Sequence, residues 1–322
     1  EMARHERRTL LIVDECHRAG APQYSKALVP AFPYRLGLTA TPERSFDPTG
    51  TRRVMAYFGG VAHRYDLGEA VQDGHLAQYT YHLHSTYLND VEQEAYDELT
   101  DAITFVMADI QWRFEDPPKL TELGHLLAFL RAEGGDELAD ELQDLLFRRA
   151  RIVKNAAGKE RVFDDLCQRL DEKKTIVFGE EIAFAERLAQ IAEDAGLPTY
   201  IYHSKLPDQE REATLAAYRS TERGVLFAVR ALDEGLDVPD ADVAVLAASS
   251  TSERQHIQRR GRVLRPLHDR RKLAELHDFY VVGVDDAWRV ERIREDADRV
   301  IYHGFEYADP PEPPAPVAST PP

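Results

Sequence analysis

The stretch Lys173–Tyr202 of this 322-residue chain, KKTIVFGEEIAFAERLAQIAEDAGLPTYIY, decides the fold. Residues 175–178 are apolar and rich in β-branched side chains, which predicts a buried strand. Residues 182–195 repeat apolar side chains at helical spacing, and Gly196 follows as the expected helix C-cap. A second strand is predicted over 199–202. Strand, helix and strand in this order predict a βαβ unit and therefore a parallel sheet.

The same alternation of strands and helices continues along the chain after this unit. It predicts one complete α/β lobe, followed by a Pro-rich tail that we expect to be disordered. The predicted helices are 207–218, 252–260 and 285–295, the further strands are 224–229, 242–247 and 277–282, and the tail is 305–322.

The N-terminal part shows a second set of strand signals. The run Thr9–Val13 is continuously apolar, which predicts a parallel strand covered on both faces. Such a strand needs neighbours that residues 1–8 cannot supply, so we expect upstream sequence or another polypeptide to complete this lobe. Further strands are predicted over 34–38, 61–67 and 79–88, with short helices over 21–29 and 68–73.

The charge of the chain is unevenly distributed. Its 57 Asp and Glu outnumber its 40 Lys and Arg, and this net charge of −17 argues against a generic nucleic-acid-binding surface. Residues 90–147, however, hold 16 acidic and 3 basic residues, so this segment contributes −13 and the rest of the chain only −4. Helical patterns interrupted at 116–118 and 134–135 predict an acidic helical insertion there, which we expect to face a protein partner or solvent.

Composition and cysteine content exclude several classes of protein. The chain is 43% hydrophobic and 30% charged, which excludes collagen-like, coiled-coil and wholly disordered chains. No apolar run approaches the length of a membrane span. Two cysteines cannot form a disulfide framework or a four-ligand zinc site, so we expect a reducing, cytoplasmic setting.

These signals predict an α/β protein of four segments. Residues 1–78 would form the back part of one parallel-sheet lobe, and residues 79–160 a linking strand and the acidic insertion. Residues 161–304 would form a complete second lobe, and residues 305–322 the tail.

Two strand ends in the N-terminal part carry polar residues suited to catalysis. Asp14 and Glu15 directly follow the first strand, where one carboxylate can hold Mg²⁺ through water while the other polarises an attacking water. Thr39 and Thr41 follow the next strand and offer two hydroxyl groups. Taken alone, each pattern also fits a solvated loop or an ordinary exit from a strand.

Two further candidates lie in the C-terminal part. Gly235 allows the backbone to approach a phosphate or sugar, and Asp237 can accept a hydrogen bond from a ribose hydroxyl, although a tight turn with capping acids also fits. Arg262 and Arg265 belong to the run 252–272, which has 8 basic and 2 acidic residues. Three apart on a helix, both arginines can point at one phosphate, and a solvated basic face is the alternative.

In this order, the motifs resemble those of superfamily 2 helicases and translocases of the DEAD/DEAH-box type, specifically the XPB-like branch. The resemblance covers residues 9–88 and 150–283 and implies RecA-like lobes, one partial and one complete, that use ATP and Mg²⁺. The stretches that match motifs II to VI are, in turn, Asp14–His17, Thr39–Thr41, Ile176–Phe178, Glu234–Asp237 and Gln258–Arg265.

The resemblance implies a role for each matching residue. Asp14 would hold Mg²⁺ through water, and Glu15 would position or deprotonate the attacking water. Arg262 and Arg265 would be arginine fingers that stabilise charge on the γ-phosphate. The other implied roles are coupling of the nucleotide and nucleic-acid sites by Thr39 and Thr41, nucleotide binding by Gly235, Asp237 and Gln258, and contact with the nucleic-acid backbone by His203, Ser204 and Arg211.

The sequence departs from the family at the phosphate-binding loop. The pattern Gly-x-x-x-x-Gly-Lys-Ser/Thr does not occur in it. The Gly158-Lys159 pair has Val153 where the first glycine is needed and Glu160 in place of the hydroxyl residue. We therefore expect the nucleotide pocket to be incomplete within these residues.

Histidines and cysteines suggest no further chemistry at this level. His82 and His84 would share one strand face, but no nearby cysteine or third histidine fixes a metal site, so packed or solvated histidines are expected. Cys16 is interpreted as a spacer within motif II rather than as a nucleophile.

Three functions fit these observations. The first is an ATP-dependent helicase or translocase, with duplex DNA favoured because the resemblance is to the XPB-like branch. The second is one subunit of a split motor whose phosphate-binding loop lies in another chain. The third is a non-catalytic, helicase-like DNA-binding scaffold, against which the joint presence of Asp14, Glu15, Arg262 and Arg265 speaks.

Overall fold

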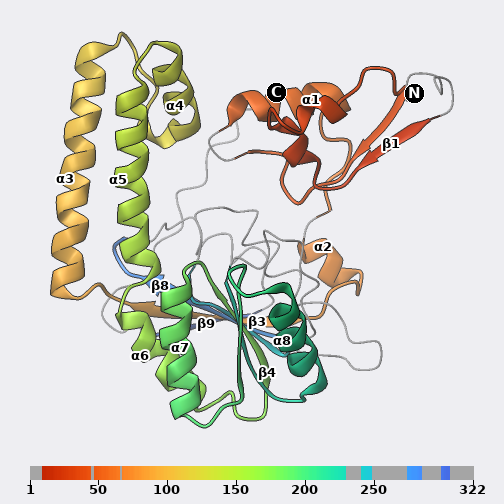
Figure 1. Ribbon diagram of the computed structural model, residues 1–322, viewed down its shortest axis with the longest axis vertical. Coiled ribbons are helices and arrows are strands. Elements are labelled where there is room, and N and C mark those ends of the chain that lie inside the picture. Colours follow the sequence, from red (N-terminus) through yellow and green to blue (C-terminus); the bar gives the residue numbers. More distant parts are fainter. Residues whose placement is uncertain are drawn as a thin grey trace. The chain divides into compact units, whose positions relative to one another are not determined.

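The computed structural model of the protein describes residues 9–44, 47–65, 67–229, 241–248, 274–284 and 299–304 (Figure 1). The chain forms two compact units. One contains residues 1–65 and 97–149, and the other contains most of the remaining chain. Among the described residues, every helix is too short or too polar to span a bilayer.

A seven-stranded sheet forms the centre of the larger unit, and its strand order is β5-β6-β4-β7-β8-β3-β9. All neighbouring strands are parallel, as the βαβ pattern predicts. The strands are β3 (Tyr79–Thr86), β4 (Lys174–Gly179), β5 (Thr199–Tyr202), β6 (Gly224–Val229), β7 (Val243–Leu246), β8 (Ala274–Val281) and β9 (Arg299–His303).

Helices cover both faces of this sheet (Figure 1). On one face, α6 (Gly158–Cys167) and α7 (Ile182–Asp194) pack on the central strands, with Phe163 and Phe227 in edge-to-face contact at 5.7 Å. On the other face, α8 (Asp208–Ser220) and residues of α2 (Leu67–Gln72) pack against a core that includes Tyr81. Burial on both faces explains the continuous apolar runs of β4, β6 and β7.

Residues 173–202 fold as predicted, into a strand, a helix and a second strand. Helix α7 buries Phe184, Leu188 and Ala192, four residues apart, on the sheet. It ends at Asp194, and Gly196 follows with a left-handed φ of 80° while its N–H donates to Glu193 O. A residue with a Cβ is strained in this conformation, so glycine ends the helix here.

The acidic segment is helical, as predicted, and it forms three helices rather than two helical stretches. They are α3 (Asp90–Arg113), α4 (Leu123–Ala132) and α5 (Asp136–Lys154), and they share a core that includes Ile110, Leu130 and Leu142. Asn89 and Glu92 form a reciprocal capping box at the start of α3, with bonds of 2.9 and 3.0 Å. The apolar faces of these helices therefore meet one another, and their acidic faces remain at the surface.

The N-terminal part contains a two-stranded parallel sheet of β1 (Leu10–Val13) and β2 (Tyr34–Gly37). The 3-10 helices η2 (Cys16–Gly20) and η3 (Ser25–Ala27) lie between these strands in sequence, and α1 (Pro48–Phe58) follows. Asp47 caps α1 by accepting from the Gly50 N–H at 2.7 Å.

One prediction for this sheet is wrong. Both strands alternate between exposed and half-buried residues, so the described residues do not cover β1 on both faces. Leu10 is 51% exposed, Ile12 57% and Tyr34 61%. Parallel pairing is confirmed, but within the described residues no element packs on this face of the sheet.

Several other predicted elements differ from the structure. Residues 61–65 form no strand, and 21–29 holds turns and η3 rather than an α-helix. Helix α1 was not predicted, although Asp47 and Pro48 are a typical start of a helix. Only the strand 61–67 was expected in this region. Strand β9 was missed as well. The predicted helices 252–260 and 285–295 and the tail 305–322 lie outside the described residues.

Candidate active site

The ends of β1 and β2 bring the two N-terminal motifs together. The Leu38 N–H donates to Val13 O, and the Cys16 N–H donates to Leu38 O, each at 2.9 Å. These two bonds extend the pairing beyond the strands. Asp14 and Glu15 therefore emerge beside the segment that holds Thr39 and Thr41, at the edge where parallel sheets place their chemistry.

Glu15 turns the chain sharply at the end of β1. Its φ of 48° and ψ of 46° lie in the left-handed region, which is unusual for a residue other than glycine. Such strain costs on the order of 1–2 kcal/mol and is typical of functional sites. The turn leaves Asp14 exposed and leads at once into η2, which buries Cys16 and His17.

His17 links the two motifs. Its Nδ1 lies 3.2 Å from Glu15 Oε2 and 3.0 Å from Thr39 Oγ1, and its side chain is 8% exposed. Thr39 Oγ1 in turn donates to Thr41 O at 2.8 Å. Because a hydroxyl has one hydrogen, Thr39 donates to Thr41 and accepts from His17, which places the imidazole proton on Nδ1.

Sequence reasoning included His17 in motif II but assigned it no role. The signal that could have identified it is its position two residues after Glu15, just past a strand end. The structure shows that this residue joins the carboxylate to the threonine segment.

Arginines from the following segment hold this turn in place. Arg44 Nη1 donates to His17 O at 2.7 Å while its Nε donates to Asp47 Oδ2 at 2.8 Å. Burial opposes ionisation of Asp47, but hydrogen bonds from Gly50 and Arg44 lower its pKa below the usual value. Arg53 Nη1 also donates to Gly20 O at 2.6 Å. The turn is therefore tied to the N-terminal region of α1.

Cys16 is a packing residue, as interpreted from its sequence position. Burial, followed in effect by the neighbouring Glu15 carboxylate, raises the pKa of its thiol. A Cβ added at Gly37 would lie 2.9 Å from Cys16 Sγ, so the glycine lets the two backbones approach closely. A thiol kept protonated in this way is a poor nucleophile.

The other predicted residues belong to the larger unit or lie outside the description. His203 and Ser204 directly follow β5, and Arg211 lies in the first turns of α8, where it pairs with Asp208. They lie near the carboxyl end of β5, but the structure does not place them relative to Glu15. Gly235, Asp237, Gln258, Arg262 and Arg265 lie outside the described residues.

Lys159, of the Gly-Lys pair, is buried at the start of α6. It is 1% exposed, and its Nζ donates to Lys154 O at 3.3 Å. A Cβ at Gly158 would lie 2.1 Å from Thr86 Oγ1, so this glycine allows the start of α6 to approach the end of β3. Packing therefore accounts for the pair.

Two family models and several known proteins match this chain. Residues 1–112 match the family model "SWI2/SNF2 ATPase", and residues 158–266 match the "Helicase conserved C-terminal domain". The DNA 3'-5' translocase XPB2 of Sulfurisphaera tokodaii is 30% identical over 288 residues, which are 89% of this chain and 62% of that protein. Putative helicase 22 of Sulfolobus islandicus filamentous virus is 25% identical over 82% of this chain and 41% of its own length.

The fold is also found among solved structures. The structure described as S. cerevisiae Dbp5 bound to RNA and ADP BeF3 matches with a TM-score of 0.52 and 14% identity, over 92% of this chain and 60% of that one. This chain spans less than two thirds of the length of these relatives. Both halves nevertheless match helicase domains, and a 30% identical relative extends across both. The chain belongs to the superfamily 2 helicases.

Proposed function

We propose that this chain carries the ATP-hydrolysing and DNA-translocating part of a superfamily 2 motor. The observation that carries the proposal is the link Glu15–His17–Thr39, which joins a candidate catalytic carboxylate to the second motif. A solvated loop of similar sequence would not bury a histidine between the two. The XPB2 relative, named a DNA 3'-5' translocase, supports DNA as the track, and the resemblance to the XPB-like branch favours duplex DNA.

The residues at the end of β1 fit ATP hydrolysis with Mg²⁺. Asp14 is exposed, so its carboxylate can hold Mg²⁺ through water. When bound, Mg²⁺ would neutralise charge on the phosphates. Glu15 is half-buried beside His17, and its carboxylate would accept a proton from the attacking water. A general base of this kind contributes about 10²–10⁴-fold to the rate.

The threonine segment would carry the state of the nucleotide site to the DNA. Thr39 accepts from His17 and donates to Thr41 O, so movement of Glu15 would be felt two hydrogen bonds away. Thr41 is itself buried. Coupling through this short, partly buried chain of contacts requires that each partner have two arrangements, which ATP and its products would select.

The remaining roles rest on the family resemblance. In this proposal Arg262 and Arg265 stabilise the γ-phosphate as arginine fingers. The residues that would bind the nucleotide are Gly235, Asp237 and Gln258. The residues that would contact the DNA backbone are His203, Ser204 and Arg211.

The phosphate-binding loop would come from outside these residues, either in a longer form of this chain or in a partner chain. The exposed apolar residues on one face of the β1–β2 sheet support this proposal, because a catalytic lobe of parallel strands is normally covered on both faces. They are Leu10, Ile12, Tyr34, Leu36 and Leu38. Mass measurement of the native protein distinguishes the two sources: one longer chain with Gly-Lys-Ser/Thr, or a second polypeptide that carries it.

The function is tested by Glu15→Gln in the native protein or complex, assayed for DNA-stimulated ATP hydrolysis. We expect a loss of at least about 100-fold with ATP binding retained. Glu222→Gln, on an exposed residue of the other unit, is the matched control and should leave the rate unchanged. Hydrolysis at the normal rate in Glu15→Gln would refute the assigned base. ATP binding without hydrolysis in the unmodified protein would favour the scaffold.

We also propose that the acidic helices bind a protein partner rather than DNA. Trp112 and Phe105 on α3 are 84% and 77% exposed on a segment with a net charge of −13. Exposed aromatic side chains are typical anchors of protein interfaces, and the acidic charge would repel DNA phosphates. Hydrogen exchange of α3 should therefore stay unchanged when DNA is added, and protection there would contradict the proposal.

A further inference from the structure

Four histidines and a glutamate lie on one face of three neighbouring strands in the larger unit. Strand β3 runs between β8 and β9, and its His82 is directly opposite His277 of β8 while its His84 is opposite His303 of β9. Glu275 precedes His277 by two residues and so points to the same face. The sequence separates these residues by up to 221 positions, which is why local spacing indicated no metal site at His82 and His84.

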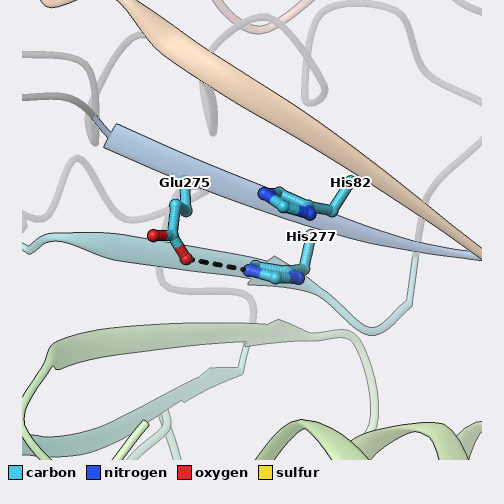
Figure 2. Close-up of side chains that lie close together, drawn as sticks. All are labelled: His82, Glu275 and His277. Carbon is cyan, nitrogen blue, oxygen red and sulfur yellow. Dashed lines mark ion pairs between the residues drawn. The ribbon is translucent and has the colours of Figure 1, made fainter. Parts of the chain in front are cut away.

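The rings form an ordered stack. His82 and His277 lie with centroids 4.4 Å apart and planes 12° apart, and Figure 2 shows them side by side with Glu275 turned toward His277. His82 Nδ1 is 3.0 Å from His303 Nε2, and His277 Nδ1 is 2.9 Å from His84 Nε2. His82 and His277 therefore each have a second histidine beside their Nδ1 atom.

One nitrogen of this cluster is buried without a hydrogen-bond partner. His277 is 2% exposed, and its Nε2 makes no hydrogen bond within the described part of the chain. The nearest acidic atom is Glu275 Oε2, at 3.5 Å. A buried ring nitrogen that lies beside a carboxylate without a hydrogen bond of normal length is an arrangement that a cation would satisfy.

Burial and neighbouring charges shift the pKa values of the groups in this cluster. Burial, together with the neighbouring histidines, lowers the pKa of His82 to about 4 and that of His84 to about 2. The pKa of His277 is lowered as well, again chiefly by burial. The His277 ring and the Lys173 ammonium hold the pKa of Glu275 at about 2.

We propose that His82, Glu275 and His277 bind a divalent transition metal ion of the Zn²⁺ class. One ligand atom from each residue lies within 4.8 Å of the others. Tetrahedral Zn²⁺ with bonds of about 2.0–2.1 Å needs ligand atoms about 3.3 Å apart, so the side chains must close by up to roughly 1.5 Å. The stacked His82 and His277 rings must also rotate so that a nitrogen of each faces the ion. Imidazole and carboxylate ligands suit Zn²⁺ and its neighbours better than Mg²⁺ or Ca²⁺.

His84 and His303 would orient the two ligand rings. If each Nδ1–H donates to the outer histidine, the Nε2 atoms of His82 and His277 keep their lone pairs for the metal. This is the usual outer-shell arrangement of histidine ligands. A pocket of about 240 Å³ lies beside His84 and His303, and it is lined also by Asp165 and Arg169 of the α6 region.

Positive charge near the site should lower its affinity for a metal ion. Lys173 Nζ lies 2.6 Å from both oxygens of Glu275, so this carboxylate must exchange the ammonium for the metal. Arg169 also acts electrostatically on His277 and His303. Removing the Lys173 charge should therefore strengthen metal binding, an effect not expected of chance binding to surface histidines.

The experiment uses the native, metal-stripped protein titrated with Co²⁺ and followed by visible absorption, with Zn²⁺ as the competitor. We expect one equivalent of Co²⁺ to give a tetrahedral spectrum that Zn²⁺ abolishes. His82→Gln should weaken binding at least about 10–100-fold. His63→Gln, on an exposed histidine of the other unit, is the matched control and should leave it unchanged.

Lys173→Gln separates a built site from chance binding even if His82→Gln fails to fold. We expect it to tighten Co²⁺ binding at least threefold. The proposal is overturned if no stoichiometric Co²⁺ spectrum appears, if a folded His82→Gln binds like the unmodified protein, or if Lys173→Gln leaves affinity unchanged or weaker. None of these outcomes depends on ATP hydrolysis, so the metal site and the proposed function fail separately.

Discussion

The two parallel sheets of this protein have the same strand chemistry and opposite surroundings. Strands β4, β6 and β7 are buried on both faces, whereas β1 and β2 leave every second residue exposed. Both sheets carry candidate functional residues at their carboxyl ends. A continuous apolar run therefore predicts that both faces of a strand are buried in the native protein, but it does not identify the polypeptide that buries them.

The largest difference between the two sheets should appear in stability. Phe227→Ala removes a fully buried ring and should lower the free energy of unfolding of its unit by about 3–5 kcal/mol. Tyr34→Ala removes a ring that is 61% exposed and should cost less than about 1 kcal/mol in the 322-residue chain. Urea unfolding followed by circular dichroism measures both, and equal losses would contradict the comparison.

His17 lies just past the end of β1, and its loss should reduce catalysis. His17→Ala removes the hydrogen bond to Thr39, worth about 0.5–1.5 kcal/mol, and the contact with the Glu15 carboxylate, so DNA-stimulated ATP hydrolysis in the native protein should fall about 2–10-fold. Lys26→Ala, on an exposed residue of the same unit, is the control. If hydrolysis falls but its dependence on DNA does not change, His17 orients Glu15 alone and does not couple the two motifs.

Acid should weaken the seven-stranded sheet through its histidines. Their native pKa values lie below the unfolded value of about 6.5, so the unfolded chain binds more protons between pH 6.5 and 4. Stability is thus complete above pH 6.5 and falls with acid by up to about 1.4 kcal/mol per pH unit for each histidine. Urea midpoints at pH 7.5, 6 and 5 should show a shallower fall in His82→Gln, and parallel curves would exclude this cluster as the cause.

The smallest test asks whether the two units unfold independently. Gly59 ends α1 and Gly196 follows α7, with φ of 82° and 80°, and a Cβ at either would meet no atom within 4 Å. Alanine should therefore cost about 1 kcal/mol at each position through backbone strain alone. Each substitution should shift only the transition of its own unit. A shift of both transitions would mean that the units unfold together.

Much of the larger unit could be predicted from sequence because its signals are local. The run from Lys173 to Tyr202 contains its own strands, helix period and C-cap glycine, and the structure has each of them. Strand β9 was missed because its five residues pair only with β3, more than 200 positions away. The covering of β1 could not be predicted, since continuous apolarity does not specify what packs on it.

In the candidate site, too, some residues could be predicted from the sequence and others could not. Asp14, Glu15, Thr39 and Thr41 could be identified from motif spacing, because adjacent parallel strands bring their ends together. The role of His17 required the left-handed turn at Glu15, which a non-glycine residue gives no reason to expect. The histidine cluster required the sheet order, because its ligands come from strands that are distant in sequence.

The position of β3 also has a consequence for synthesis of the protein. Tyr79 of β3 pairs with Ala274 of β8, a separation of 195 residues (274 minus 79). At roughly 5–20 residues per second, the ribosome takes about 10–40 s to produce that partner strand, and β9 follows later still. During this interval the apolar side chains of β3 have no native place in a sheet. The nascent chain should therefore depend on holding chaperones at this stage, and truncation before residue 274 should give aggregation rather than a smaller folded lobe.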